Sequence, residues 1–204
     1  MNEPRIGVLA LQGDVREHRS ALLELGAQVV RVRTAQHLEG LDGLVLPGGE
    51  STAIANLATT FGVMEPLRDA VRSGLPCFGT CAGMVLLADR ILDGAEGQRT
   101  VGGLDVTVRR NGFGRQVDSF EQDVDVAGVE GPVRAVFIRA PWVVEAGSDV
   151  EILARVGGDA AQGEVGDGRI VAVRQGVLMA TSFHPEVGGD LRLHRSFLDL
   201  VRAT

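Results

Sequence analysis

The segment "FGTCAGM", residues 78–84, places Cys81 between Gly79 and Gly83 at the end of an apolar stretch. Residues 76–80 have the pattern of a short buried strand, and the residues from Ala82 to Arg90 have that of a helix. Small flanking residues let such a strand-to-helix turn pack closely against its neighbours. The segment therefore predicts a sharp turn that points the Cys81 thiol out at the carboxyl edge of a sheet, where open α/β folds bind ligands.

The first half of the chain alternates short apolar segments with helical patterns. The apolar segments are residues 6–11, 29–32, 43–48 and 76–80. Between them lie two helical patterns, one that starts at an expected N-cap, Asp14, and ends at Gly26, and one that ends at Gly74. Short apolar strands that alternate with helices are typical of a parallel sheet covered on both faces.

The second half has a different rhythm. Its strand-like segments are joined by Gly, Asp and Pro turns, which is typical of antiparallel strands; they are residues 104–108, 133–141, 150–156, 169–175 and 177–183. A last helix covers residues 191–203, and the glycine-rich residues 157–168 are expected to form a hairpin tip. We predict one α/β domain over residues 1–204, a doubly wound three-layer sandwich with a mostly parallel central sheet and added antiparallel strands.

Composition limits the function. The chain has 27 acidic and 20 basic residues and a net charge of -7, with the basic residues scattered, which argues against nucleic-acid binding. No apolar stretch approaches the roughly 20 residues needed to cross a bilayer, and the N-terminus has the pattern of a first strand, so we expect a cytoplasmic protein with no membrane contact. The spacing of Cys77 and Cys81 fits neither a disulfide framework nor a zinc site, and we expect no metal and no cofactor.

The G-x-C-x-G pattern has the layout of a nucleophile elbow. A helix that begins after Cys81 directs its positive end at the sulfur, which favours the thiolate, and leaves the N–H of Ala82 free to hold an oxyanion. The alternative is a buried structural cysteine beside a glycine turn. Two glycines in register favour a nucleophile at Cys81, whereas Cys77, on the strand itself, is expected to be structural.

A nucleophilic cysteine generally needs a base, and the chain has four histidines. His184 emerges at the end of an apolar strand in "SFHPE", residues 182–186. Glu186 follows two residues later and faces the same side of an extended segment, so it can orient the imidazole. Cys81, His184 and Glu186 then form a triad. Solvated or structural roles are expected for the others, which are His18, His37 and His194.

A third segment, "LPGGEST" (residues 46–52), has the pattern of a strand, two glycines and a helix. Ser51 or Thr52 is expected to cap that helix. Glycines here let backbone N–H groups approach a ligand, and the N–H of Gly49 is expected to be the second oxyanion donor. The alternative interpretation is an ordinary strand-to-helix turn.

The segments "GTCAG", "PGGEST" and "SFHPE" together resemble class I (triad-type) glutamine amidotransferases, whose glutaminase domains have a flavodoxin-like fold. "LALQGDVREH", "RRNGFGRQVDSFE" and "VFIRAP" are similar to the glutaminase subunits of pyridoxal 5'-phosphate synthase. The resemblance implies that the chain hydrolyses L-glutamine to glutamate and ammonia through a cysteine thioester. Cys81 matches the nucleophile, His184 the general base and Glu186 its orienting carboxylate.

The same resemblance implies a glutamine-binding set and a partner. The positions that match are Gly49, Glu50, Ser51, Arg110, Ile138 and Arg139. The partner is the synthase subunit, which receives the ammonia in a hetero-oligomeric complex and raises the glutaminase activity when it docks. One departure is Gly112, which stands where a small side chain such as Ala or Ser is expected.

Two other functions stay open at this point. The first is a glutaminase that serves a different synthase, such as the imidazole glycerol phosphate system, although "VREH" and "FGRQVDSFE" argue against it. The second is a non-enzymatic domain whose cysteine elbow senses redox stress. A sensor needs neither the "HPE" segment nor the paired glycines.

Overall fold

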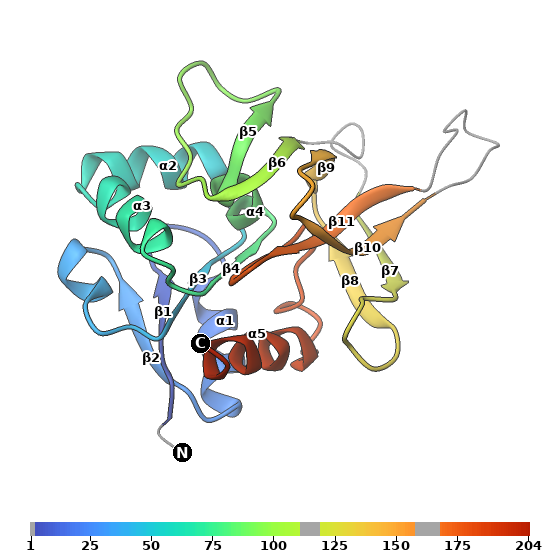
Figure 1. The fold of residues 1–204 in the computed structure, drawn as a ribbon, viewed down its shortest axis with the longest axis horizontal. Coiled ribbons are helices and arrows are strands. Elements are labelled where there is room, and N and C mark those ends of the chain that lie inside the picture. Colours follow the sequence, from blue (N-terminus) through green and yellow to red (C-terminus); the bar gives the residue numbers. More distant parts are fainter. Residues whose placement is uncertain (1–2, 111–118, 158–167) are drawn as a thin grey trace.

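A mixed ten-stranded sheet runs through the centre of the protein (Figure 1). The computed structural model describes residues 3–110, 119–157 and 168–204. Four strands from the first half lie parallel in the order β2-β1-β3-β4: β1 (Arg5–Leu9), β2 (Gln28–Val32), β3 (Gly43–Leu46) and β4 (Cys77–Thr80). This order has the reversal of a flavodoxin-like sheet, and such a reversal creates a ligand site at the carboxyl edge.

The strands after β4 in the chain extend this sheet. Beyond β4 the order continues β12-β11-β9-β6-β5, with β10 paired to β11. These strands are β5 (Ala88–Leu92), β6 (Leu104–Arg109), β9 (Trp142–Ala146), β10 (Glu151–Val156), β11 (Arg169–Gln175) and β12 (Leu178–Thr181). β12 runs parallel to β4, whereas β9, β10 and β12 all pair antiparallel with β11. A separate hairpin joins β7 (Phe120–Val124) to β8 (Val133–Phe137).

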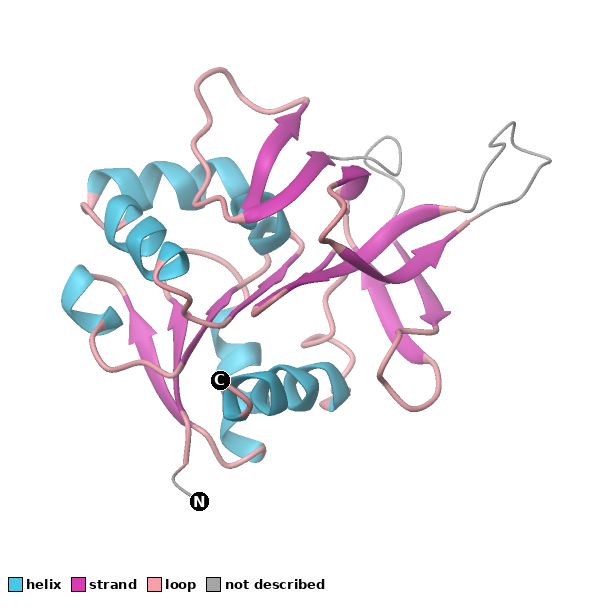
Figure 2. Cartoon of the chain, in the orientation of Figure 1, coloured by secondary structure: helices cyan, strands magenta, loops and turns pink. Residues whose placement is uncertain are grey.

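Helices cover both faces of the sheet (Figure 2). α2 (Ser51–Thr60), α3 (Met64–Arg72) and α4 (Ala82–Leu87) lie on one face and share a core with it. α1 (Val15–Glu24) and α5 (Arg192–Arg202) lie on the other face and share a second core, while a short 3₁₀ helix, η1 (Ala35–Leu38), follows β2. The predicted three-layer α/β architecture with a mostly parallel sheet and added antiparallel strands is confirmed.

The pattern of α5 explains how the second layer is held. Leu193, Phe197 and Val201 recur every four residues and are all buried, because residues four apart lie on one face of a helix. Burying a side chain of this size stabilises the fold by about 1.5–3 kcal/mol each. The apolar stripe therefore fixes α5 against β1 and β4, through contacts such as that of Phe197 with Phe78.

Several sequence predictions need correction. The helix expected from Ala82 to Arg90 ends at Leu87, because the chain turns at Ala88 into β5, which pairs with β6. The arginine at its expected end, Arg90, instead forms an ion pair with Asp105. β7 and β9 were not predicted. The expected hairpin at 157–168 is flanked by β10 and β11, which pair as predicted, but its tip and Gly112 lie outside the described residues.

Candidate active site

Cys81 lies at a strained turn between β4 and α4. Its backbone has φ 47° and ψ -102°, a region that side chains rarely occupy and that is often found at functional sites. A Cβ atom on Gly79 would lie 2.6 Å from the carbonyl carbon of Gly83, and one on Gly83 would lie 2.0 Å from the carbonyl oxygen of Leu46. Gly79 is therefore required for β4 to pack against α4, and Gly83 for the elbow to pack against β3, as the sequence predicted.

The strand order brings the three predicted segments together. β3, β4 and β12 are neighbours and run in the same direction, with Leu46 opposite Gly79 and Thr80 opposite Thr181. The N–H of Cys81 donates to the carbonyl of Thr181 at 2.8 Å, which ties the elbow to the strand that leads to His184. Because the carboxyl ends of parallel strands share one edge of a sheet, the loops at 47–50, 81–82 and 182–186 meet there.

His184 and Glu186 are buried beside the elbow. The Nδ1 atom of His184 lies 2.9 Å from Oε1 of Glu186, as expected for a carboxylate that orients an imidazole. A second carboxylate also reaches this nitrogen, because Oδ2 of Asp14 lies 3.1 Å from it. Asp14 occupies the N-cap position of α1 as predicted, yet its side chain makes no cap hydrogen bond and contacts His184 instead. No sequence pattern predicts this contact.

The surroundings of His184 favour its charged form. Burial opposes charging, but the contacts with Asp14, Cys81 and Glu186 outweigh it and raise the pKa of His184 far above its ordinary value of 6.5. Burial likewise opposes ionisation of Glu186, while the contacts with His18 and His184 lower its pKa well below the usual range. The site therefore holds a His184 imidazolium between the carboxylates of Asp14 and Glu186.

The other cysteine has a different environment. Cys77 is fully buried in β4 and donates its thiol to the carbonyl oxygen of Leu75 at 3.2 Å. Burial raises the pKa of Cys77 to about 12, which keeps it a neutral thiol. This agrees with the structural role expected for it, and both cysteines are free thiols.

Asp14, His184 and Glu186 place one ligand-type atom each within 4.8 Å of one another. A metal ion needs a lone pair on the imidazole, whereas Nδ1 of His184 faces two carboxylates and must carry a proton to bind them. Hydrogen bonds thus account for this cluster without an ion.

A pocket of about 100 Å³ opens in front of Cys81. Its lining includes every residue that the resemblance assigned to glutamine or to the oxyanion, namely Gly49, Glu50, Ser51, Ala82, Arg110, Ile138 and Arg139. His184 and Glu186 are not in the lining. Arg139 also has a positive φ, 45°, as Cys81 does. The loops at 49–51, 110 and 138–139 thus meet around the thiol.

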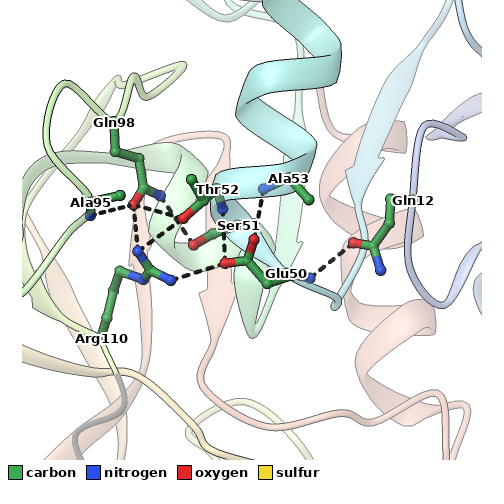
Figure 3. Close-up of polar contacts among 8 residues, drawn as sticks. All are labelled: Gln12, Glu50, Ser51, Thr52, Ala53, Ala95, Gln98 and Arg110. Carbon is green, nitrogen blue, oxygen red and sulfur yellow. Dashed lines mark hydrogen bonds and ion pairs between the residues drawn. The ribbon is translucent and has the colours of Figure 1, made fainter.

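Polar contacts among partly buried side chains shape one wall of the pocket (Figure 3). Nη2 of Arg110 lies 2.9 Å from Oε1 of Glu50, and Nη1 donates to the hydroxyl oxygen of Thr52 at 3.0 Å. Glu50, rather than Ser51 or Thr52 as predicted, caps α2, because its carboxylate accepts the N–H groups of Thr52 and Ala53. Although partial burial opposes ionisation, these contacts lower the pKa of Glu50.

Gln98 binds two residues of this wall and was missed from the sequence. Its Oε1 accepts Nη1 of Arg110 at 2.6 Å, and its Nε2 donates to the hydroxyl of Ser51 at 3.0 Å (Figure 3). The residue comes from the loop between β5 and β6, which has no strand or helix pattern. Gln98 thus connects the loop after β3 with the arginine at the end of β6.

The glycine loop after β3 packs closely against the segment before α1. A Cβ atom on Gly13 would lie 1.8 Å from the carbonyl oxygen of Gly48, and the side chain of Gln12 accepts the N–H of Glu50 at 2.9 Å. Gly49 has a φ of 151°, which favours glycine. The conformation of this loop is therefore set by residues 12–14, which the sequence did not assign to the site.

The remaining histidines have distinct environments. His37 is exposed in η1 and contacts Thr34, so it is far from a catalytic setting. His18 and His194 are fully buried and contact each other. From the sequence, both were predicted to lie on helices with a solvated or a structural role. Their burial excludes a solvated role. Among the described residues, no helix has the length and apolar character needed to cross a membrane.

Comparison with known proteins gives a consistent result. The SNO glutamine amidotransferase family matches residues 8–203. A pyridoxal 5'-phosphate synthase subunit PdxT of Nocardioides sp. is 62% identical over 198 residues, which is 97% of this chain and 96% of the relative. The subunit PdxT of Nocardia farcinica is 60% identical over 203 residues, covering 99% and 88% of the two chains.

Solved structures agree with this result. A structure described as a glutamine amidotransferase has a TM-score of 0.86 and 49% identity, and the match covers 97% of this chain and 98% of the other. A putative GMP synthase subunit from Thermoplasma acidophilum has a TM-score of 0.65 over 100% and 96% of the two chains. Its 18% identity makes this a likeness of fold alone.

Proposed function

The chain belongs to the SNO glutamine amidotransferase family, and from this premise we propose that Cys81, His184 and Glu186 are the catalytic residues of a glutaminase subunit of pyridoxal 5'-phosphate synthase. Relatives at about 60% identity over nearly the full chain carry that subunit's name. In this proposal residues 1–204 act as one glutaminase domain. The observation that carries it is the buried contact between His184 and Glu186 beside a cysteine elbow that faces a pocket.

The first half of the reaction forms a thioester. The Cys81 thiolate attacks the side-chain carbonyl carbon of glutamine, and the N–H groups of Gly49 and Ala82 stabilise the resulting oxyanion. The His184 imidazolium then gives its proton to the nitrogen of the leaving group, so the carbon–nitrogen bond breaks and ammonia departs. Because the raised pKa of His184 keeps it charged beside the thiolate, the nucleophile and the acid are both ready before the substrate binds.

The second half releases glutamate. Formation of the thioester removes the negative charge of the sulfur, which is one of the interactions that stabilise the imidazolium. The neutral His184 then takes a proton from water, and the hydroxide attacks the thioester carbon. Collapse of this intermediate expels the Cys81 thiolate and restores the starting ion pair. Glu186 remains ionised throughout and keeps the ring oriented.

Charged groups at the pocket fit a free amino acid. The α-carboxylate of glutamine needs cationic or N–H partners, which Arg110, Arg139 and the backbone of residues 49–51 provide. The α-ammonium needs an anion, and Glu50 is an ionised carboxylate in the lining. Arg110 and Glu50 also bind each other, so the two recognition groups are oriented before glutamine arrives.

The ammonia must reach an acceptor on another chain. Free ammonia is mostly protonated at neutral pH and is then a poor nucleophile, so we propose direct transfer to a docked synthase subunit that raises the glutaminase activity. A cytoplasmic location belongs to this proposal, because the nucleophile must stay a reduced thiol. A glutaminase for another synthase is not favoured, since the relatives above carry the pyridoxal 5'-phosphate synthase name.

Glutamate release from glutamine by the purified chain, alone and with a pyridoxal 5'-phosphate synthase subunit added, tests the proposal. We expect release that rises markedly when the synthase subunit is present. No release in either condition, with the protein folded and Cys81 reduced, would contradict the proposal and favour a cysteine-based redox sensor.

A further inference from the structure

Two buried histidines continue the contacts of the catalytic carboxylate into the helical layer. His18 lies on α1 and His194 on α5, the two helices that cover the same face of the sheet (Figure 1). Both side chains are fully buried. Nδ1 of His18 lies 2.8 Å from Nε2 of His194. On its other side, Nε2 of His18 lies 3.0 Å from Oγ1 of Thr80 and 3.3 Å from Oε1 of Glu186.

These contacts determine where the protons lie. Nδ1 of His194 is buried and has no partner among the described residues. A buried N–H without an acceptor is costly, so the proton of a neutral His194 belongs on Nε2 and is donated to His18. Burial is the largest cause that lowers the pKa of His194, and the adjacent His18 is the second. The pKa falls to about 3, so the His194 ring stays neutral. Nδ1 of His18 is then an acceptor, and the proton on its Nε2 forms a hydrogen bond with Oγ1 of Thr80 at 3.0 Å and has Oε1 of Glu186 as its next neighbour, 3.3 Å from the nitrogen.

Glu186 depends on this donor because it has few others. Its Oε2 atom is buried without a partner in the described part of the chain, and its Oε1 atom contacts only the two histidine rings, Nδ1 of His184 and Nε2 of His18. During the reaction the proton of His184 moves to the substrate and back. His18 takes no part in that transfer, so its N–H remains a constant partner of the carboxylate.

We propose that His18 is a positioning residue of this active site, which donates its Nε2–H to Glu186 and is held in turn by His194, so that the carboxylate keeps the orientation that His184 requires. The inference rests on the proposed glutaminase function. It assigns a role in the reaction to two helices that otherwise only cover the sheet. Because His18 acts on Glu186, glutamine binding at the pocket is unaffected.

The pH dependence of turnover should change when the His18 donor is lost. The charged and titratable groups nearest Glu186 are His18 of α1, Asp14 before α1, His184 of its own segment, His194 of α5 and Cys81 beyond His184. A cavity that Glu186 lines is also lined by Arg16, Glu17 and Glu24 of α1 and by Asp190 before α5. Burial alone raises the pKa of a carboxyl group, and His18 is one of the two contacts that lower it here. Without the His18 donor, Glu186 takes up a proton at higher pH, so the acid limb of the activity profile moves upward.

Two substitutions of His18 separate positioning from packing. His18→Leu keeps most of the volume but removes the donor, whereas His18→Gln retains an N–H near the place of Nε2. In the complex with the synthase subunit we expect His18→Leu to lower kcat about 10- to 100-fold with little change in the KM for glutamine, because a hydrogen bond to a charged group is lost. His18→Gln should restore most of kcat and of the acid limb. His37→Leu, the same change at an exposed histidine, is the control.

An equal loss of kcat in His18→Leu and His18→Gln with an unchanged pH profile would overturn the proposal, because it would mean that His18 only fills space. The proton assignment can also be tested on the wild-type protein, without any variant, from the side-chain ¹⁵N shifts of the histidines. We expect a proton on Nε2 of His18, and a His18 ring with no proton there would overturn the proposal. This measurement does not depend on turnover, so it separates a failure of the inference from a failure of the glutaminase function.

Discussion

The two sides of the site are built in different ways. The proposed catalytic side consists of Cys81, His184 and Glu186, all buried, at the ends of β4 and β12 and backed by α1 and α5. The proposed binding side consists of loop residues such as Glu50 and Arg110, and the side chain of Glu50 is 43% exposed. Sheet register and core packing fix the catalytic side, whereas contacts between polar side chains fix the binding side. A substitution on the catalytic side should therefore change kcat, and one on the binding side should change KM.

The largest expected effect is on the catalytic side. Cys81→Ala removes the nucleophile, and we expect glutamate release to fall by a factor of about 10⁴ or more, as for other enzymes that lose a nucleophile. Glutamine should still bind, because the polar wall of the pocket is untouched, and titration calorimetry checks this. Turnover that stays within about 100-fold of the wild type would show that the two sides are assigned wrongly.

Arg110→Ala tests the binding side. Charge-assisted hydrogen bonds contribute about 1.5–3 kcal/mol, so we expect the KM for glutamine to rise about 10- to 100-fold while kcat changes less. Steady-state kinetics with the synthase subunit present measures both. Arg109→Ala is a matched control, because Arg109 is the preceding residue and instead lies 3.3 Å from Asp93 in an exposed ion pair. Equal effects of the two substitutions on KM would contradict a role for Arg110 in glutamine binding.

The helical layer behind the triad should make the fold sensitive to acid. An unfolded histidine takes up a proton as pH falls through its ordinary pKa of 6.5, whereas folded His194 resists protonation down to about 3. Its contribution to stability is thus present above 6.5 and is lost as pH falls, by about 2 kcal/mol at roughly pH 5. In urea unfolding at roughly pH 7.5 and pH 5, His194→Gln should lose less stability on acidification than the wild type. An unchanged pH dependence would contradict a buried neutral His194, and His37→Gln is the control.

The smallest expected effect concerns Gln98. This side chain joins Ser51 and Arg110 but does not line the pocket, so Gln98→Ala should raise the KM for glutamine only about 2- to 10-fold, as expected for one or two neutral hydrogen bonds. Gln36→Ala, at an exposed position of η1, should leave KM unchanged. A fall in kcat without a rise in KM would place Gln98 with the catalytic side instead.

The sequence revealed the catalytic side more fully than the binding side. The elbow can be predicted from the sequence because a Cβ atom on either glycine around Cys81 would lie 2.6 Å or less from backbone atoms, so both positions require glycine. The strand pattern before Cys81 places the elbow at the edge of a sheet. The triad could be assembled because parallel strands end together. Those features depend on the local sequence pattern and on the strand order, and the residues of β3, β4 and β12 encode both.

Contacts between distant segments were not readable. Asp14 has a good N-cap position by pattern, yet its carboxylate contacts His184, and Glu50 takes the capping role expected of Ser51 or Thr52. Gln98 comes from a loop without periodicity. His18 is close to charged residues in the sequence, which suggested a solvated position, but α1 turns it toward α5. In each case the partner is set by tertiary packing, which periodicity does not encode.

In the proposed reaction, glutamine forms a thioester with Cys81. The most direct test is to mix the chain and its synthase subunit with glutamine, quench with acid and locate the γ-glutamyl group by mass spectrometry of the peptides. We expect the adduct on Cys81 and none on Cys77, which is fully buried and whose pKa burial raises to about 12. Steady glutamate release with no adduct on Cys81, or with an adduct elsewhere, would contradict it.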